Sequence, residues 1–146
     1  MSEAPRLFGS EEEIREMGRG LLEHSLPKEC WTHEAHLAAC LWIVAERPEI
    51  DPDRDMRAII SSYNAAVGGV NDDHGGYHDT ITACFIAGVR NWLLRAPQGS
   101  LTERVNGLLG APEGQRDWPL RFFTRDRLFS VVARRHFIAP DIAPLP

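Results

Sequence analysis

The chain has 146 residues, of which 43% are apolar and 25% are charged, and its formal net charge is −5. This length favours one domain with a core of its own, and no apolar run approaches the ~20 residues that span a membrane. Residues 81–146 carry nine Lys and Arg, but acids are interleaved with them and the overall pI is about 5.6. We therefore expect a soluble protein whose partner is neither a nucleic acid nor a membrane.

Three cysteines, Cys30, Cys40 and Cys84, form no C-x-x-C pair. Reduced thiols in a cytoplasmic protein are the simplest interpretation. Cys30 precedes His33 by three residues near a predicted helix start, a setting that can lower the pKa of a thiol. A nucleophilic thiolate is therefore an alternative to an ordinary buried thiol at this position.

The first predicted elements are two helices. Ser10 precedes three glutamates, and this pattern predicts a helix start with a capping box. A second helix begins at Pro27 or at Thr32 and runs to about Arg47, because Pro48 stops it. No stretch of the chain shows a convincing strand pattern.

Further helices follow with the same kind of signals. A third helix opens around 51–53 and ends at Gly68-Gly69, and a polar loop leads to a fourth helix from about Tyr77 to Arg95. A fifth helix covers roughly 100–109. One or two short helices between Thr124 and His136 precede an extended tail. The pattern predicts an all-α, single-domain helical bundle over residues 1–146, with 110–146 as an irregular C-terminal extension packed on four main helices.

Histidine stands at the polar end of two of these apolar helices, in W-T-H-E-A-H-L at 31–37 and G-G-Y-H-D-T-I-T at 75–82. Short connections make consecutive helices antiparallel, so the second and fourth helices should run the same way and share an end. His33 and His36 project from one side of the second helix, and His78 heads the apolar stripe of the fourth. We expect these three imidazoles to converge.

Three imidazoles at helix amino termini would favour a metal site. The helix dipole disfavours imidazolium, and neutral imidazole is the form that ligates metal ions. Three protein ligands with an open position are typical of zinc or iron sites that activate water, and iron or nickel can activate dioxygen-like ligands. The predicted ligands of such a divalent transition metal are His33, His36 and His78. The other candidate site residues flank them: Asp79, Glu34 and Tyr77 as catalytic groups, and Trp31, Tyr63, Asn64 and Thr80 as substrate-binding groups.

Structural roles are the alternative for each of these residues. A histidine in the first turn of a helix can hydrogen-bond a backbone carbonyl, and Asp79 and Glu34 suit a helix start by charge alone. Trp31 can be a core residue. The chain has no Walker loop and no dinucleotide fingerprint, so we expect no nucleotide cofactor, and His33-Glu34-Ala35-His36 is one residue too short for H-E-x-x-H.

Motifs W-T-H-E-A-H-L and G-Y-H-D-T-I-T, together with the ending R-L-F-S-V-V-A-R-R-H-F-I-A-P-D-I-A-P-L, resemble those of an uncharacterised family of small bacterial all-helical proteins. This resemblance covers most of the chain and implies no particular activity. The chain is more loosely similar to DinB-like metal-binding four-helix bundles, which also gather three histidines inside a bundle. Here the close histidine pair comes first, so their ligand assignments do not transfer.

Two functions are consistent with these features. The first is a metal-dependent enzyme that acts on a small molecule through a three-histidine site. The second is a non-catalytic helical domain that binds a small ligand or another protein. The sequence leaves open whether copies of the chain form a homo-oligomer.

Overall fold

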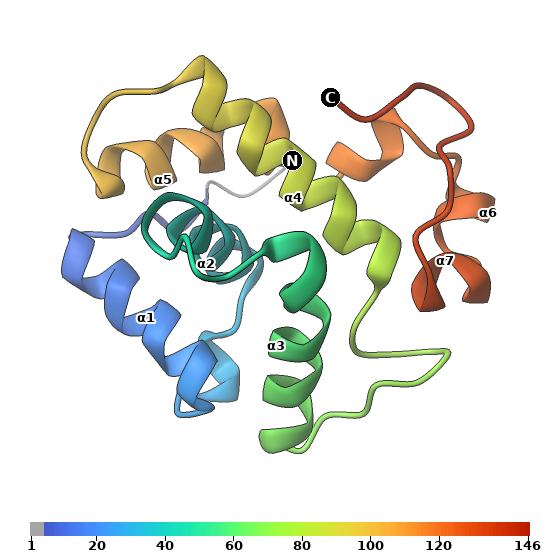
Figure 1. The fold of residues 1–146 in the computed structure, drawn as a ribbon, viewed down its shortest axis with the longest axis horizontal. Helices are drawn as coiled ribbons and strands as arrows, with labels where there is room; N and C mark the ends of the chain where they lie inside the picture. The colour runs from blue at the N-terminus through green and yellow to red at the C-terminus, as the bar shows by residue number, and fades with distance from the viewer. Residues whose placement is uncertain (1–4) are drawn as a thin grey trace.

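A computed structural model describes residues 5–146 as a bundle of helices, and no strand occurs among them (Figure 1). The helices in chain order are α1 (Glu11–Glu23), α2 (His33–Glu46), α3 (Pro52–Ala66), α4 (Asp79–Arg95), α5 (Leu101–Gly110), α6 (Arg125–Leu128) and α7 (Val131–Arg135). Short 3-10 turns lie at η1 (Lys28–Cys30), η2 (Pro112–Gly114) and η3 (Trp118–Arg121). The all-α, single-domain prediction is confirmed. Within the described residues, no helix is both long and apolar enough to cross a membrane.

Side-chain caps fix where most of the helices begin. The hydroxyls of Ser10, Thr32 and Ser100 each accept a hydrogen bond from the backbone three residues on, which satisfies an amide that has no partner inside the helix. Ser100 and Glu103 form a complete capping box. The box predicted at Ser10 is incomplete, because Glu13 accepts from the amide of Gly9, one residue before the cap. The cap at Thr32 settles the start of α2, since Pro27 begins the separate turn η1.

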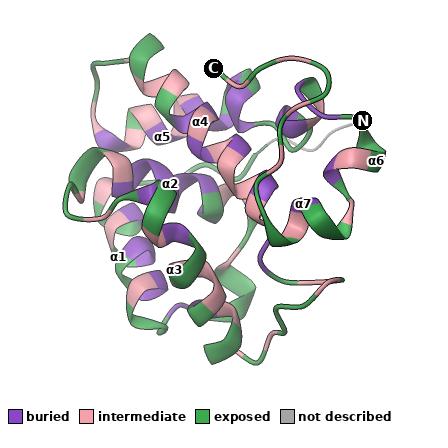
Figure 2. Ribbon diagram, turned by 45° about the vertical axis from the view of Figure 1, so that its right-hand side comes forward, coloured by how far each residue is buried: buried purple, intermediate pink, exposed green. Residues whose placement is uncertain are grey.

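Helix α2 is the centre of the bundle and is apolar on nearly all sides. Eight of its 14 residues are buried, including the whole run 37–43. It contacts α1, α3, α4 and α5, and Figure 2 shows it as the most continuously buried helix, in contrast to the largely exposed α3. A helix that is hydrophobic all round belongs in a core. Close approach is required on the α1 side, because a Cβ at Gly18 would overlap the ring of Trp42.

A second apolar cluster joins the C-terminal segment to α4. It consists of Cys84, Trp118, Phe122, Phe123 and Leu128. The Trp118 indole donates a hydrogen bond to the Cys84 carbonyl at 2.8 Å, and the amide of Ile142 donates to the Phe122 carbonyl. The C-terminal tail is therefore packed on the bundle.

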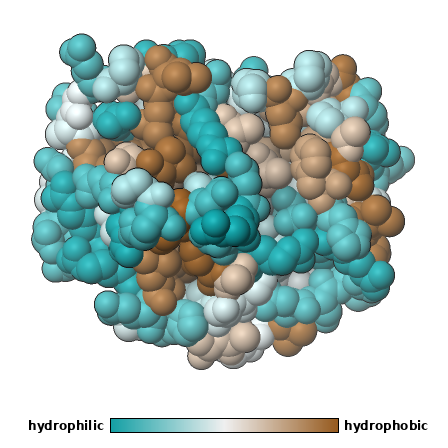
Figure 3. Space-filling view, viewed as in Figure 1, coloured by the Kyte–Doolittle hydropathy of each residue, from teal (hydrophilic) through white to brown (hydrophobic). Residues whose placement is uncertain are grey.

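The outer surface of this segment is partly apolar. Figure 3 shows hydrophobic residues gathered over the region of α6 and α7, where Phe129, Val131 and Val132 are exposed.

Candidate functional site

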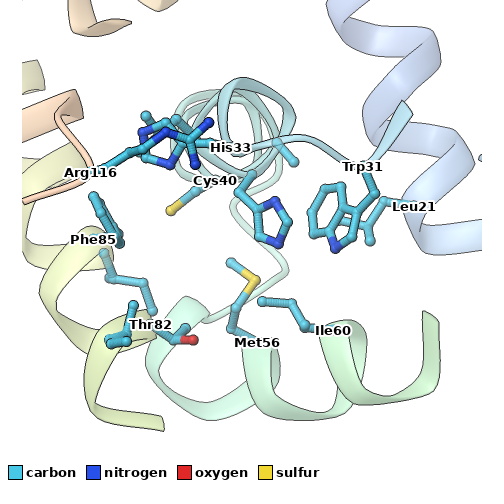
Figure 4. Close-up of a pocket in the computed structure, with 14 residues that line it drawn as sticks. Leu21, Trp31, His33, Cys40, Met56, Ile60, Thr82, Phe85 and Arg116 are labelled. Carbon is cyan, nitrogen blue, oxygen red and sulfur yellow. The ribbon is translucent and has the colours of Figure 1, made fainter. Parts of the chain in front are cut away.

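A cavity of about 310 Å³ opens between α1, α2, α3 and α4 (Figure 4). Its wall is mainly apolar, and its polar groups are two imidazoles, one hydroxyl, one guanidinium, the Cys40 thiol and the indole N–H of Trp31, which is buried without a hydrogen-bond partner in residues 5–146. The lining residues are Leu21, Trp31, His33, His36, Leu37, Ala39, Cys40, Met56, Ile60, Ile81, Thr82, Phe85, Ile86 and Arg116. Ligand pockets commonly combine such an apolar wall with a few polar groups, and this volume lies at the lower end of their range.

His36 lies in this wall with one ring nitrogen fixed and the other free. Its Nδ1 is 2.6 Å from the Thr32 carbonyl oxygen, and its ring stacks on Trp31 with the ring centroids 3.7 Å apart. A carbonyl oxygen only accepts, so Nδ1 carries the proton and Nε2 keeps a lone pair. Nε2 has no hydrogen-bond partner in residues 5–146. His36 therefore offers one acceptor to the cavity.

The surroundings of His36 favour its neutral form. The residue remains exposed to solvent, while its ring stacks on Trp31 and one nitrogen is bonded to Thr32. Loss of solvation, followed by repulsion from His33, lowers the pKa of His36 to about 4, and the hydrogen bond to Thr32 opposes this shift. At neutral pH the free Nε2 is an acceptor and not a donor.

His33 lines the same cavity but has a structural bond of its own. Its Nε2 donates to the Gly114 carbonyl oxygen at 2.8 Å, and its ring meets the edge of Phe85 at a centroid distance of 5.7 Å. The bond joins the first turn of α2 to η2, 81 residues further along the chain. His33 therefore fixes the rim of the cavity.

Thr82 and Arg116 are two further polar residues of the cavity. The Thr82 hydroxyl donates to the His78 carbonyl at 2.7 Å, so only its lone pairs are left for a ligand. Arg116 extends along the same edge of the cavity as His33, opposite Met56 and Ile60 (Figure 4).

His78 does not line this cavity, contrary to the expected convergence. It is the N-cap of α4: its Nδ1 accepts from the Ile81 amide at 3.1 Å, and its Nε2 donates to the Leu128 carbonyl at 2.9 Å. Both ring nitrogens are occupied, so His78 offers no lone pair to an ion in this arrangement. The predicted start of the fourth helix at Tyr77 is therefore two residues early.

His78 lies away from His33 and His36 because of the way α2 packs on α4. His33 touches Phe85, which follows His78 by seven residues and thus lies about 10 Å further along the helix axis at 1.5 Å per residue. The first turn of α2 therefore faces the middle of α4 and not its beginning. Among residues 5–146, no three His, Cys, Asp or Glu side chains are grouped so that they could hold a metal ion. A metal-binding role for these histidines stays a prediction.

The other predicted residues around His78 hold the C-terminal segment. Asp79 accepts hydrogen bonds from the Tyr77 hydroxyl and the Phe137 amide, and it pairs with Arg57 at 3.0 Å. Thr80 donates to the carbonyl of His136 and accepts from the amide of Ile138. Burial, followed by the bond to Asp79, raises the pKa of Tyr77 well above its ordinary value. These contacts hold residues 136–138 against the start of α4.

The predicted residues that remain lie at three further places. Tyr63 is fully buried, and its hydroxyl donates to the Leu26 carbonyl at 2.8 Å. Asn64 bonds the side chain of Asn71. Glu34 lines a separate cavity of about 320 Å³ together with the exposed thiol Cys30. Of the ten predicted site residues, only Trp31, His33 and His36 line the cavity described above.

Arg116 is the functional candidate that the sequence analysis missed. It lies 95 residues after Leu21, the first residue that lines the cavity. The segment around it contains several arginines and acids and looked like an ordinary mixed-charge surface. The bond between His33 and Gly114 and the ion pair between Arg116 and Glu34 show that this segment meets α2. No local pattern in the sequence reports such a contact.

Comparison with protein-family models, curated proteins and solved structures finds no significant match to this chain. The candidate site must therefore be interpreted from its own geometry.

Proposed function

We propose that this protein binds a small, mainly apolar molecule in the cavity between α1 and α4, and that His36 accepts a hydrogen bond from it. The observation that carries this proposal is the free Nε2 of His36 in a mainly apolar wall. A ligand with a hydroxyl or N–H group would satisfy that nitrogen, and its body would replace water against the apolar residues.

The size of the cavity limits the ligand. At roughly 30 Å³ for each water in the liquid, 310 Å³ corresponds to about ten water volumes. A molecule of about ten non-hydrogen atoms is therefore the right scale. Burial of such a body against Leu37, Met56 and Phe85 would supply the main part of the binding free energy, and His36 would orient it.

A metal-dependent reaction stays a separate prediction. Ligand binding needs only His36 and the apolar wall, whereas the three-histidine centre needs His78, which caps α4. The geometry therefore favours the non-catalytic alternative as the function to test first.

Two matched probes test this proposal, 4-ethylphenol and 4-ethylanisole, which differ in whether they can donate a hydrogen bond. We expect both to shift amide resonances of residues lining the cavity in a nuclear magnetic resonance titration. One neutral hydrogen bond contributes about 1 kcal/mol, so the phenol should bind about fivefold more tightly. His36→Phe keeps a ring against Trp31 but lacks the acceptor, and it should abolish this difference. His36→Gln should retain part of it.

Two further variants control for position. Ile60→Trp places bulk in the cavity and should weaken both probes. His74→Ala removes an exposed imidazole from the loop before α4 and should weaken neither. The proposal fails if neither probe shifts these resonances at its solubility limit, or if Ile60→Trp leaves binding unchanged.

A further inference from the structure

Arg116 is the only arginine, lysine or acid among the side chains that line the cavity. The two imidazoles there are one neutral acceptor and one ring bonded to Gly114. A charged ligand would therefore meet a single full charge in this wall, and that charge is positive. The positive charge of Arg116 favours a negatively charged ligand.

The guanidinium of Arg116 is weakly engaged inside the protein. Its ion pair is with Glu34 at 3.8 Å, too long for a hydrogen bond, and the side chain is 77% exposed. By contrast, Arg95 holds the carboxylate of Glu113 through two bonds at 2.8 and 2.9 Å. Among residues 5–146 the Arg116 side chain forms no hydrogen bond, and its contact with Glu34 is only an ion pair at 3.8 Å. Its donors are free to turn toward a ligand.

The backbone beside Arg116 is nevertheless held in place. The side-chain amide of Gln115 donates to the carbonyls of Leu109 and Ala111, and His33 donates to Gly114. These bonds fix the turn that carries Arg116 to the rim of the cavity. The backbone at Arg116 is therefore fixed, while its guanidinium can still turn toward a ligand.

We propose that the ligand is an amphipathic carboxylic acid whose carboxylate pairs with Arg116 at the rim while its apolar body occupies the cavity. This inference rests on the proposed function, because it names the ligand class for the same cavity. A guanidinium presents parallel N–H groups that match the two oxygens of a carboxylate. The carboxylate would displace Glu34, whose contact with Arg116 is long and exposed to solvent on the arginine side.

The test compares 3-(4-hydroxyphenyl)propionate with 3-(4-hydroxyphenyl)propan-1-ol, which share the phenol but differ in charge. In titrations of the full chain followed by calorimetry and nuclear magnetic resonance, we expect the acid to bind roughly tenfold more tightly than the alcohol at low ionic strength. The ratio should fall as salt is added, since an exposed pair is screened. Arg116→Gln should reduce the ratio to about one and leave the affinity for the alcohol unchanged.

Arg125→Gln is the matched control, because it removes the same charge from an exposed residue of α6 that does not line the cavity. It should leave the ratio as in the unchanged protein. Equal affinities for acid and alcohol, or equal losses in the two variants, would overturn the carboxylate assignment and leave the binding cavity standing. Failure of both probes to bind would overturn the cavity as well.

Discussion

The beginnings of α2 and α4 carry similar sequences but have opposite surroundings. Each has histidine near the start of an apolar helix, and His33 and His78 each precede an acidic residue. At α2, His36 stacks on Trp31 beside a cavity and keeps one nitrogen free. At α4, His78 is 7% exposed and both of its nitrogens are bonded. One helix start is open to a ligand, and the other is closed by protein.

The difference arises from what packs on each helix. The C-terminal segment covers the start of α4 through Leu128, His136 and Phe137. No comparable segment covers His36 on its cavity side. Histidine at a helix start thus takes its role from distant parts of the chain, and substitutions at the two ends should have different consequences.

The largest expected effect is loss of stability in His78→Ala. This substitution removes the N-cap of α4 and leaves the Leu128 carbonyl without its donor, so it should cost about 2 to 3 kcal/mol. His36→Ala should cost about 1 kcal/mol, because the stacking on Trp31 and the bond to the Thr32 carbonyl that it removes are both at an exposed position. Urea unfolding followed by circular dichroism measures both.

His78→Asn sharpens this comparison. Asparagine is a good N-cap but is too short to reach Leu128, so it should recover about 1 kcal/mol of the loss. A greater loss in His36→Ala than in His78→Ala would contradict the distinction drawn between the two helix starts.

A smaller effect is expected from Thr80→Val, which keeps the shape of the side chain but removes its hydroxyl. The fully buried Thr80 would no longer bond His136 and Ile138, at a cost of about 1 to 2 kcal/mol. Because these bonds hold the C-terminal segment, trypsin should cleave faster after Arg134 and Arg135. Thr82→Val is the matched control: its hydroxyl bonds a carbonyl in its own helix turn, and its removal should change neither property measurably.

Local signals in the sequence predicted the helices well. Ser10, Thr32 and Ser100 are recognisable caps because the acceptor and the amide that it satisfies are three residues apart. Helix content, the short C-terminal helices and the single domain follow from such patterns. His78 was misplaced because imidazole is an uncommon cap, and its other partner lies 50 residues away.

The candidate site was only partly predictable, because one of its residues is brought in by contacts between distant parts of the chain. Trp31 lies just before α2, and His33 and His36 lie at its start, so the sequence showed that these three residues belong together. Arg116 reaches them through a turn whose position depends on the bond between Gly114 and His33 and on the packing of α4. The position at which one helix crosses another decides this contact. The sequence indicates which helices run in the same direction, but it does not indicate where they cross.

A separate expected effect is on the pH dependence of stability, and it reports on the protonation of His36 in the folded protein. Its pKa falls from the ordinary 6.5 to about 4 in the folded protein. Between these values the unfolded chain binds a proton at this position that the folded protein does not, so stability decreases as the pH falls from 6.5 to 4. His36→Phe removes this contribution to the pH dependence, and the urea midpoint of the variant should therefore decline less over the same range.

His78 also has a lowered pKa, mainly through burial, so its contribution persists in this variant and the decline should be reduced and not abolished. Identical declines in the two proteins would mean that His36 is protonated in the folded protein as readily as in the unfolded chain, and that its surroundings do not favour the neutral form.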